Sequence, residues 1–384
     1  MIIKAYKQRI YPNKEQKGLI EKHFGANRWI YNWALNKKIE VYQKNKKSIG
    51  CFDLIRELPK LKKENEWLKE VSSQSLQQPI RNLDNAFTRF FRQKKGFPNF
   101  KSKRKSRNSF QSPQGNKIDF ENKRLQFEKI GKIKIRLEKE IKGKIKTVII
   151  SKNNINQYFA SIVVETPNNC LKKKLIKEKT TVGIDLGIKD FATLSTGKKI
   201  KNNKYLKKSE RRLKVLHRRL SKKHKGSKNR KKAKFNLAKL YNKITNQRSD
   251  FLHKFTFELT HDNQVHTIAI EDLNVGGMIK NHCLAKSISD VAWSEFRRQL
   301  TYKCEWYGKN LIVIGRFEPS SKMCSCGAIN NDLKLSDRIW TCKKCGLTHD
   351  RDILASQNIK KFAIEKQNLI SPLPKGKEPA ELSQ

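Results

Sequence analysis

The first 45 residues change from an extended pattern to a helical one. Residues 2–11 alternate apolar and polar positions as a β-strand does, and Pro12-Asn13 ends this segment. Asn13 and Gln16 have the spacing of a capping box, so we expect a helix from Lys14 onward. Its broad apolar face, which we assign to the core, carries Leu19, Ile20, Phe24, Trp29, Ile30, Trp33 and Leu35.

The next periodic segment, residues 73–93, predicts a second amphipathic helix. Apolar residues recur at steps of three and four positions, at Leu76, Ile80, Leu83, Phe87 and Phe90. Amide and guanidinium side chains fall between them, at Gln74, Gln77, Gln78, Arg81 and Arg89. Pro79 is expected to kink this helix or to mark its start. The polar positions have two interpretations, because Gln and Arg can read base edges in a groove and also form ordinary solvated faces.

Between residues 94 and 166 the pattern becomes extended. Residues 94–107 read KKGFPNFKSKRKSR, in which Gly and Pro end the helix and aromatic rings lie among cations. This composition suits backbone contact and base stacking on a single strand or a heteroduplex, with Lys101, Lys103 and Arg104 as candidate contacts. Period-two segments follow at residues 117–120, 124–127, 132–137, 146–150 and 158–165. Together with the first strand they predict a small antiparallel β-barrel.

A polar, lysine-rich linker at residues 168–179 separates this barrel from an α/β half. The strand at 181–187 is apolar except for Asp185, and residues 191–195 return beside it as a hairpin. A second apolar strand, at 266–273, ends in Glu271, whereas Asp272 should face the other side of the sheet. Buried strands rarely carry a carboxylate without a partner, so both strands hold candidate functional acids. A helix at about 291–307 and a strand at 310–317 complete this half.

Residues 201–248 contain 20 Lys or Arg and a single acid, Glu210. Two helical patterns joined at Gly226 predict a helical hairpin with almost wholly cationic exposed faces. A solvated face ordinarily mixes charge signs, so we interpret this hairpin as a surface that tracks phosphates. Candidate contacts are Lys228, Arg230 and Lys231.

Bulk composition favours the same partner. The 384 residues include 86 Lys or Arg and 35 Asp or Glu, a formal net charge of +51, which a polyphosphate partner explains through counterion release. No apolar run of 18 residues and no signal-peptide core occurs, so no membrane role is expected. Four cysteines are scattered singly and predict structural thiols in a reducing, cytoplasmic compartment, at Cys51, Cys170, Cys283 and Cys304.

The other four cysteines form two close pairs, Cys324 with Cys326 and Cys342 with Cys345, separated by 15 residues. A glycine follows each pair, and the spacing is typical of a four-thiolate zinc site; clustered free thiols are the alternative. The first pair is Cys-x-Cys, one residue shorter than the commoner form.

A third candidate acid follows the cysteines. The run His349-Asp350-Arg351-Asp352 opens a predicted helix, which places Asp352 at a helix N-terminus beside the zinc unit. Capping explains one aspartate of this run, and we expect Asp350 to be largely dispensable. Asp185, Glu271 and Asp352 offer the ligands that Mg²⁺ prefers, and a metal pair about 3.5–4 Å apart is the arrangement that hydrolyses phosphodiesters. Ordinary caps and turns are the alternative for each acid taken singly.

Several motifs carry a family resemblance. They are Gly183-Ile184-Asp185-Leu186-Gly187-Ile188-Lys189, Ile270-Glu271-Asp272-Leu273, Pro319-Ser320-Ser321-Lys322, Leu335-Ser336-Asp337-Arg338, Asp350-Arg351-Asp352 and Asn358-Ile359, with a weaker Gly96-Phe97-Pro98-Asn99-Phe100-Lys101. With these motifs the chain resembles the TnpB family, the RNA-guided DNA endonucleases of insertion sequences that are related to type V CRISPR nucleases.

The resemblance implies a multidomain α+β fold. Residues 1–12 and 108–170 would form a wedge β-barrel, with a helical recognition domain inserted at 13–107. Residues 180–319 and 350–366 would form an RNase H-like RuvC nuclease domain, interrupted by a zinc-ribbon insertion at 320–349. Residues 367–384 read as a disordered tail.

The resemblance also implies a function. A guide RNA from the transposon end and a double-stranded DNA target are the implied partners, and a short target-adjacent motif is recognised before cleavage. Asp185, Glu271 and Asp352 would hold Mg²⁺, and the four cysteines one structural Zn²⁺. The helix with Gln74, Gln77, Gln78 and Arg81 is the candidate reader of the motif. A prokaryotic, cytoplasmic protein, nucleoid-associated when on DNA, is expected.

Two rival functions keep the same fold. One is a nuclease-inactive, RNA-guided repressor, which has no reason to retain all three acids. The other is a transposase that acts directly on transposon ends and needs no guide. RNA co-purification and RNA-dependent cleavage separate the three functions.

Overall fold

The computed structural model describes residues 2–138, 140–166, 172–334 and 336–370. The chain forms two compact units, Met1–Asn169 and Cys170–Gln384, which are described one at a time. The last helix, α10 (Arg351–Ile370), continues through residues 367–370, which the sequence had placed in the tail. The rest of the expected tail, 371–384, lies outside the described residues.

A seven-stranded antiparallel sheet forms the first unit's core. Its strands are β1 (Ile2–Tyr11), β2 (Asn108–Ser112), β3 (Lys117–Asp119), β4 (Arg124–Phe127), β5 (Gly131–Arg136), β6 (Lys144–Lys152) and β7 (Tyr158–Thr166), in the order β2-β6-β7-β1-β5-β4-β3. The first strand belongs to the sheet, as predicted, and lies at its centre, while β2 was not predicted as a strand. The sequence pattern predicted a small antiparallel β-barrel; because β2 and β3 are edges, the sheet is a half-barrel.

The first unit's helices lie between β1 and β2 in the sequence. They are α1 (Lys14–Asn45), α2 (Cys51–Arg56), α3 (Leu58–Glu64), the 3₁₀ turn η1 (Glu66–Glu70) and α4 (Ser73–Gln93). The capping box of α1 is confirmed: Gln16 N donates to Asn13 Oδ1 (2.8 Å) and Asn13 N donates to Gln16 Oε1 (3.1 Å). Helix α4 is also confirmed, with Pro79 inside it. Its apolar face is fully buried only as far as Leu83.

A five-stranded mixed sheet forms the second unit's core. Its strands are β8 (Thr181–Leu186), β9 (Asp190–Leu194), β10 (Lys199–Lys201), β11 (Thr267–Glu271) and β12 (Asn310–Ile314), in the order β10-β9-β8-β11-β12. β8, β11 and β12 are parallel, whereas β9 and β10 are antiparallel to their neighbours. The carboxyl ends of β8 and β11 therefore lie at the same edge.

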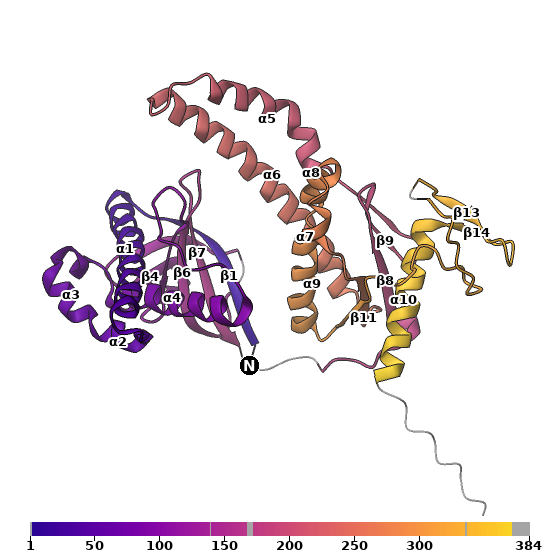
Figure 1. The fold of residues 1–384 in the computed structure, drawn as a ribbon, viewed down its shortest axis with the longest axis horizontal. Coiled ribbons are helices and arrows are strands. Elements are labelled where there is room, and N and C mark those ends of the chain that lie inside the picture. The colour runs from indigo at the N-terminus through magenta and orange to yellow at the C-terminus, as the bar shows by residue number, and fades with distance from the viewer. Residues whose placement is uncertain (1, 139, 167–171, 335, 371–384) are drawn as a thin grey trace, which may run out of the picture. The chain divides into compact units, whose positions relative to one another are not determined.

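Helices complete the second unit (Figure 1). In chain order they are η2 (Glu178–Thr180), α5 (Tyr205–Ser221), α6 (Lys228–His261), α7 (Val275–Met278), α8 (His282–Val291), α9 (Trp293–Tyr307) and α10, with the short hairpin β13 (Ile339–Thr341) and β14 (Thr348–Asp350) before α10. Phe191, Phe255 and Phe296 pack together at the centre of the unit's core. Helix α10 lies directly on β8, since a Cβ at Gly183 would fall 2.1 Å from Ser356 O.

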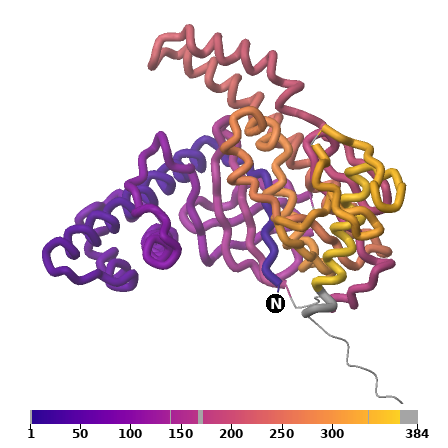
Figure 2. The backbone as a smooth tube through the Cα atoms, turned by 45° about the vertical axis from the view of Figure 1, so that its right-hand side comes forward, coloured from indigo at the N-terminus to yellow at the C-terminus, as the bar shows by residue number. Residues whose placement is uncertain are grey.

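The cationic hairpin predicted from the sequence is confirmed. Helices α5 and α6 run antiparallel as a long pair (Figure 1, Figure 2) and bury Leu213, Leu237, Leu240 and Ile244. Gly226 makes the turn with a φ of +90°, a conformation that favours glycine. The narrow apolar seam leaves most Lys and Arg side chains exposed.

Candidate active site and nucleic-acid interface

Asp185, Glu271 and Asp352 come from three elements that pack together. Ile184 of β8 pairs with Ile270 of β11 in parallel register, so Asp185 and Glu271 are the next residues on adjacent strands. Helix α10, which lies on β8, supplies Asp352 in its first turn. The pKa of Asp185 is raised to about 7, first by burial and then by the negative charges of Glu271 and Asp352. Three carboxylates thus share one electrostatic environment.

Neighbouring side chains hold two of these acids in place. Ser320 Oγ donates to Glu271 Oε1, and burial raises the pKa of Glu271 while this hydrogen bond opposes the rise. Arg338 Nη1 donates to both carboxylate oxygens of Asp352, at 3.0 and 3.2 Å. The sequence pattern alone did not mark Ser320 or Arg338 as site residues. The only sequence feature that could have pointed to them is that each lies in one of the motifs that carry the family resemblance.

Asp350 holds the start of α10 in place, a role that its sequence position did not reveal. Its Oδ1 accepts from the backbone N–H groups of Asp352 (3.0 Å) and Ile353 (3.1 Å), and its Oδ2 pairs with Lys199 Nζ (2.7 Å). Asp350 therefore fixes the first turn of α10, and its loss should disturb Asp352. We therefore expect Asp350 to be needed for the position of Asp352, in contrast to the expectation from the sequence that it is dispensable.

Asp272 has different partners. It is paired with Arg297 (2.6 Å) and Arg316 (2.7 Å). These arginines lower its pKa through hydrogen bonds, in contrast to the raised pKa of Asp185. Asp272 is therefore a matched control for the three acids.

The four cysteines of the two pairs meet. Their sulfur atoms all lie within 4.8 Å of one another, with Cys324 to Cys345 at 3.5 Å and Cys326 to Cys342 at 3.7 Å. A tetrahedral zinc with Zn–S bonds of about 2.3 Å requires sulfurs about 3.8 Å apart, so the cluster fits one Zn²⁺. The short first pair does not prevent this geometry. Among the described residues, this is the only group of three or more potential metal ligands whose ligand atoms lie that close to one another.

The cysteine cluster is tied to the acids by two side chains. His349 Nε2 lies 3.0 Å from Cys324 Sγ, and His349 directly precedes Asp350. Asn358 of α10 is buried and donates Nδ2 to Ser320 O (2.7 Å) and Met323 O (2.6 Å). His349 thus connects the cluster to the segment that carries Asp352, and Asn358 connects it to Ser320, the hydrogen-bond partner of Glu271.

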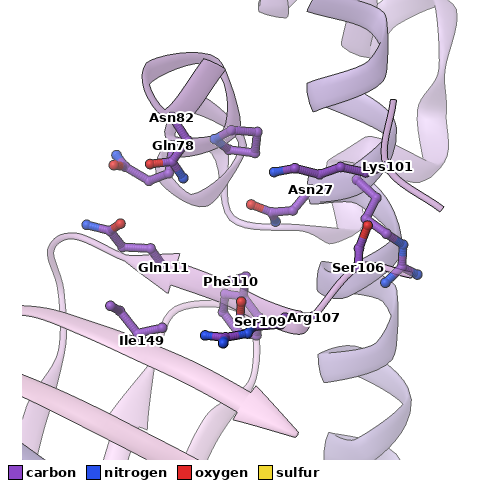
Figure 3. A pocket seen from close by; sticks show the side chains of 12 residues that line it. Asn27, Gln78, Asn82, Lys101, Ser106, Arg107, Ser109, Phe110, Gln111 and Ile149 are labelled. Atoms are coloured by element: carbon purple, nitrogen blue, oxygen red, sulfur yellow. The ribbon is translucent and has the colours of Figure 1, made fainter. Parts of the chain in front are cut away.

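The first unit has a polar pocket of about 460 Å³ between α4 and β2. Figure 3 shows Gln78 and Asn82 on the helix opposite Gln111 on the strand, with the Lys101 side chain reaching in beside them. Lys101 is fixed by its backbone, since its N donates to Asn32 Oδ1 (2.7 Å) and its O accepts from Asn32 Nδ2 (2.9 Å). Burial lowers the pKa of Lys101. The pocket offers amides and a desolvated cation to a polar ligand.

The other predicted nucleic-acid contacts are dispersed. Of the helix residues, Gln78 lines the pocket, Gln74 bonds to Gln114 (3.4 Å), and Arg81 lies over the Phe52 ring. Half-buried or exposed positions are held by Gln77, Lys103, Arg104, Lys228 and Lys231.

Arg230 is committed to the fold of the hairpin. Its Nη1 donates to Leu220 O (2.9 Å) and Lys223 O (2.8 Å), which closes the turn between α5 and α6. Lys228 and Lys231 therefore represent the exposed cationic face better than Arg230 does.

No helix in the described part of the chain is long and apolar enough to cross a membrane.

Three family models match the sequence: one described as "Probable transposase" at residues 161–282, one as "Cas12f1-like, TNB domain" at 293–359, and one as "Helix-turn-helix domain" at 1–47. The last range consists in this chain of β1 and α1.

Relatives match the chain almost end to end. The chain is 39% identical over 365 residues to a Streptomyces pristinaespiralis protein named "Putative RNA-guided DNA endonuclease", which covers 93% of this chain and 88% of the relative. It is 32% identical over 374 residues to "Putative RNA-guided DNA endonuclease InsQ" of Escherichia coli (strain K12), which covers 93% of this chain and 91% of that one. The chain belongs to the TnpB family.

A similar fold is found among solved structures. One of them is titled "Cryo-EM structure of the Cas12f1-sgRNA-target DNA complex", with a TM-score of 0.58 and 15% sequence identity, over 94% of this chain and 98% of that chain. At this identity the likeness concerns the multidomain α+β fold.

Proposed function

We propose that this protein is an RNA-guided, Mg²⁺-dependent DNA endonuclease whose second unit is an RNase H-like RuvC domain. The observation that carries the proposal is the convergence of Asp185, Glu271 and Asp352 from β8, β11 and α10. The strand order, with three parallel and two antiparallel strands, supports this domain type. The names of the two relatives support the same activity.

The three carboxylates suit Mg²⁺ by their chemistry, because hard cations prefer oxygen ligands and stabilise the ionised form of a buried acid. Bound Mg²⁺ supplies charge that activates water and stabilises the leaving oxygen in phosphodiester hydrolysis. Ser320 orients Glu271 through its hydroxyl. Arg338 holds Asp352 by two hydrogen bonds and presents a guanidinium at the same edge, where a phosphate oxygen can accept from it.

Base pairing with a guide would select the target, so the protein needs to hold nucleic-acid backbones. The net charge of +51 and the cationic hairpin α5–α6 fit that need. Family membership supports the proposal that the guide derives from the transposon end. The polar pocket of the first unit is our candidate for the reader of a short target-adjacent motif, with Gln78, Asn82 and Gln111 as hydrogen-bonding groups.

RNA sequencing tests the guide directly. The protein is produced together with its own transposon end, the RNA that co-purifies is sequenced, and cleavage of a complementary duplex is measured with and without that RNA. Guide-dependent cleavage is expected. Cleavage or joining of transposon ends without RNA would identify a transposase, and guided binding without cleavage a repressor.

The motif reader makes a separate prediction. In a depletion assay over randomised adjacent sequences, Gln78→Ala with Asn82→Ala should relax or shift the preferred motif, because an amide that contacts a base edge discriminates by about 1–3 kcal/mol. Gln74→Ala is expected to have less effect, since Gln74 does not line the pocket. Lys228→Ala with Lys231→Ala is the control, which should weaken cleavage at all motifs alike. An unchanged motif in the Gln78 and Asn82 variant, with activity intact, would contradict the assignment.

The raised pKa of Asp185 predicts a pH-dependent cost to stability. Its folded pKa of about 7 exceeds the ordinary value of 3.8, so the folded protein gains protons relative to the unfolded chain and loses stability as pH rises from about 4 to 7. A shift of this size corresponds to roughly 4 kcal/mol. At pH 8 in a buffer without Mg²⁺ and without chelator, so that zinc is kept, Asp185→Asn should therefore melt several degrees above the parent protein.

Two conditions test the cause of that difference. At pH 4 the gap in melting temperature should nearly close, because that pH is near the ordinary value of 3.8, so the carboxyl is protonated in the folded parent and largely protonated in the unfolded chain. Added Mg²⁺ should raise the melting temperature of the parent more than that of Asp185→Asn. Equal melting temperatures of both proteins at pH 8 would contradict the charge repulsion.

A further inference from the structure

Four phenylalanine rings gather where α4 ends, and the fold leaves them accessible. Phe91 is 73% exposed and Phe97 is 46% exposed, while Phe87 and Phe90 are half-buried. Phe97 meets Phe87 and Phe90 edge-on, each with ring centroids 5.5 Å apart. Phe91 lies 6.2 Å from Phe87 at an interplanar angle of 23°. We call these four residues the phenylalanine platform.

The platform is a built feature of the first unit. Helix α4 ends at Lys94, whose φ of +50° reverses the chain and returns Phe97 to the helix. Pro98 is buried directly after it. Further along, Lys101 is held to α1 by its two hydrogen bonds with Asn32. The rings are thus held in place before any partner binds.

The surroundings of the platform are cationic. No acid occurs between Asp84 and Asp119. The same stretch carries ten cations, at Arg89, Arg92, Lys94, Lys95, Lys101, Lys103, Arg104, Lys105, Arg107 and Lys117. A second copy of this chain would bring like charges together, which opposes association through this face. Exposed rings among cations instead match a polyanion with accessible π-faces, which is an unpaired nucleic-acid strand.

We propose that the phenylalanine platform binds unpaired nucleobases of the DNA strand that the guide displaces. The proposal deepens the proposed function and rests on it. Phe91 follows Gln78 by 13 positions in α4, which corresponds to about 20 Å along the helix. This distance equals about six base steps of 3.4 Å. A strand released next to a motif read at Gln78 therefore reaches the rings within about six nucleotides.

Single-strand binding by the guide-loaded protein tests the platform without requiring cleavage. The probes are a 20-nucleotide DNA strand with no complementarity to the guide and an abasic strand of equal length. Phe91→Leu with Phe97→Leu should weaken binding of the base-containing strand about tenfold or more, because a stacking partner is lost. Binding of the abasic strand should change less than about twofold, and its salt dependence should remain, since the cations are intact.

Matched variants separate stacking from folding. Phe91→Trp should retain binding, because indole stacks at least as well as phenyl. Phe120→Leu is the control, since Phe120 is 47% exposed and has no aromatic neighbour among the described residues. Equal losses for both probes would overturn the proposal, as would no loss for either.

A second pair of measurements tests the occupant. In a target duplex opened beside the motif, a 2-aminopurine about six nucleotides along the displaced strand should be quenched by the parent protein and not by the double variant. Loss of RNA binding with DNA binding intact would assign the rings to the guide and overturn the proposal. A dimer that Phe91→Leu dissociates would assign them to a second copy. If the parent protein stacks the DNA bases but never cleaves DNA, the proposed nuclease function is wrong, whereas the proposed binding of bases by the phenylalanine platform is supported.

Discussion

Replacing Asp185 by alanine is expected to abolish guided DNA cleavage, by a factor of about 10³ or more, while guide and target binding persist. Asp185 lies at the end of β8, beside Glu271 and Asp352, and its charge serves to hold Mg²⁺ rather than substrate. Its removal also relieves like-charge repulsion, so the variant should fold at least as well as the parent. Single-turnover cleavage and filter binding measure the two effects separately.

Asp272→Asn is the control for this experiment. Asp272 directly follows Glu271 in the chain and is paired with Arg297 and Arg316. It should keep most of the cleavage activity. Cleavage by Asp185→Ala at the rate of the parent in saturating Mg²⁺ would remove Asp185 from the site. Asp350 is unsuitable as a control, because it caps α10 and so positions Asp352.

The sequence was sufficient for features that depend on local pattern. The boundaries of α4, the capping box at Asn13 and the hairpin turn at Gly226 follow from periodicity, side-chain spacing and glycine placement, which act over a few residues. Asp185 and Glu271 could be selected because each interrupts or ends an apolar strand. Their parallel register, which brings them together, is long-range and appears only in the structure.

Features that depend on tertiary partners could not be predicted. Strand β2 consists mostly of polar residues and is a strand because β6 pairs with it. Phe90 continues the helical period of Leu83, yet α4 extends past the core it packs on, so the ring is only half-buried. Ser320 and Arg338 are ordinary polar residues until Glu271 and Asp352 are placed beside them. Asp350 was expected to be dispensable, because its hydrogen bonds to the backbone of Asp352 and Ile353 appear only in the structure.

Removal of any one thiolate of the cysteine cluster is expected to unfold the zinc unit and, through it, to stop cleavage. Structural zinc contributes roughly 10 kcal/mol or more to small units of this kind, so Cys345→Ser should lose the metal and the local fold together. His349 and Asn358 then lose their partners at Cys324 and Met323, and the supports of Asp352 and Glu271 loosen. Zinc content by elemental analysis and cleavage rates should fall together.

The ties between the cluster and the acids predict a graded result as well as this loss. His349→Ala keeps all four thiolates but removes the group 3.0 Å from Cys324 Sγ, so zinc should be lost to a chelator about 10–100 times more readily. Cys283→Ser is the control, because Cys283 is an exposed single cysteine outside the cluster. It should keep both zinc and activity. Full cleavage by protein that contains no zinc would show that the acids are positioned independently of the cluster, since α10 would then hold Asp352 by its packing on β8 alone.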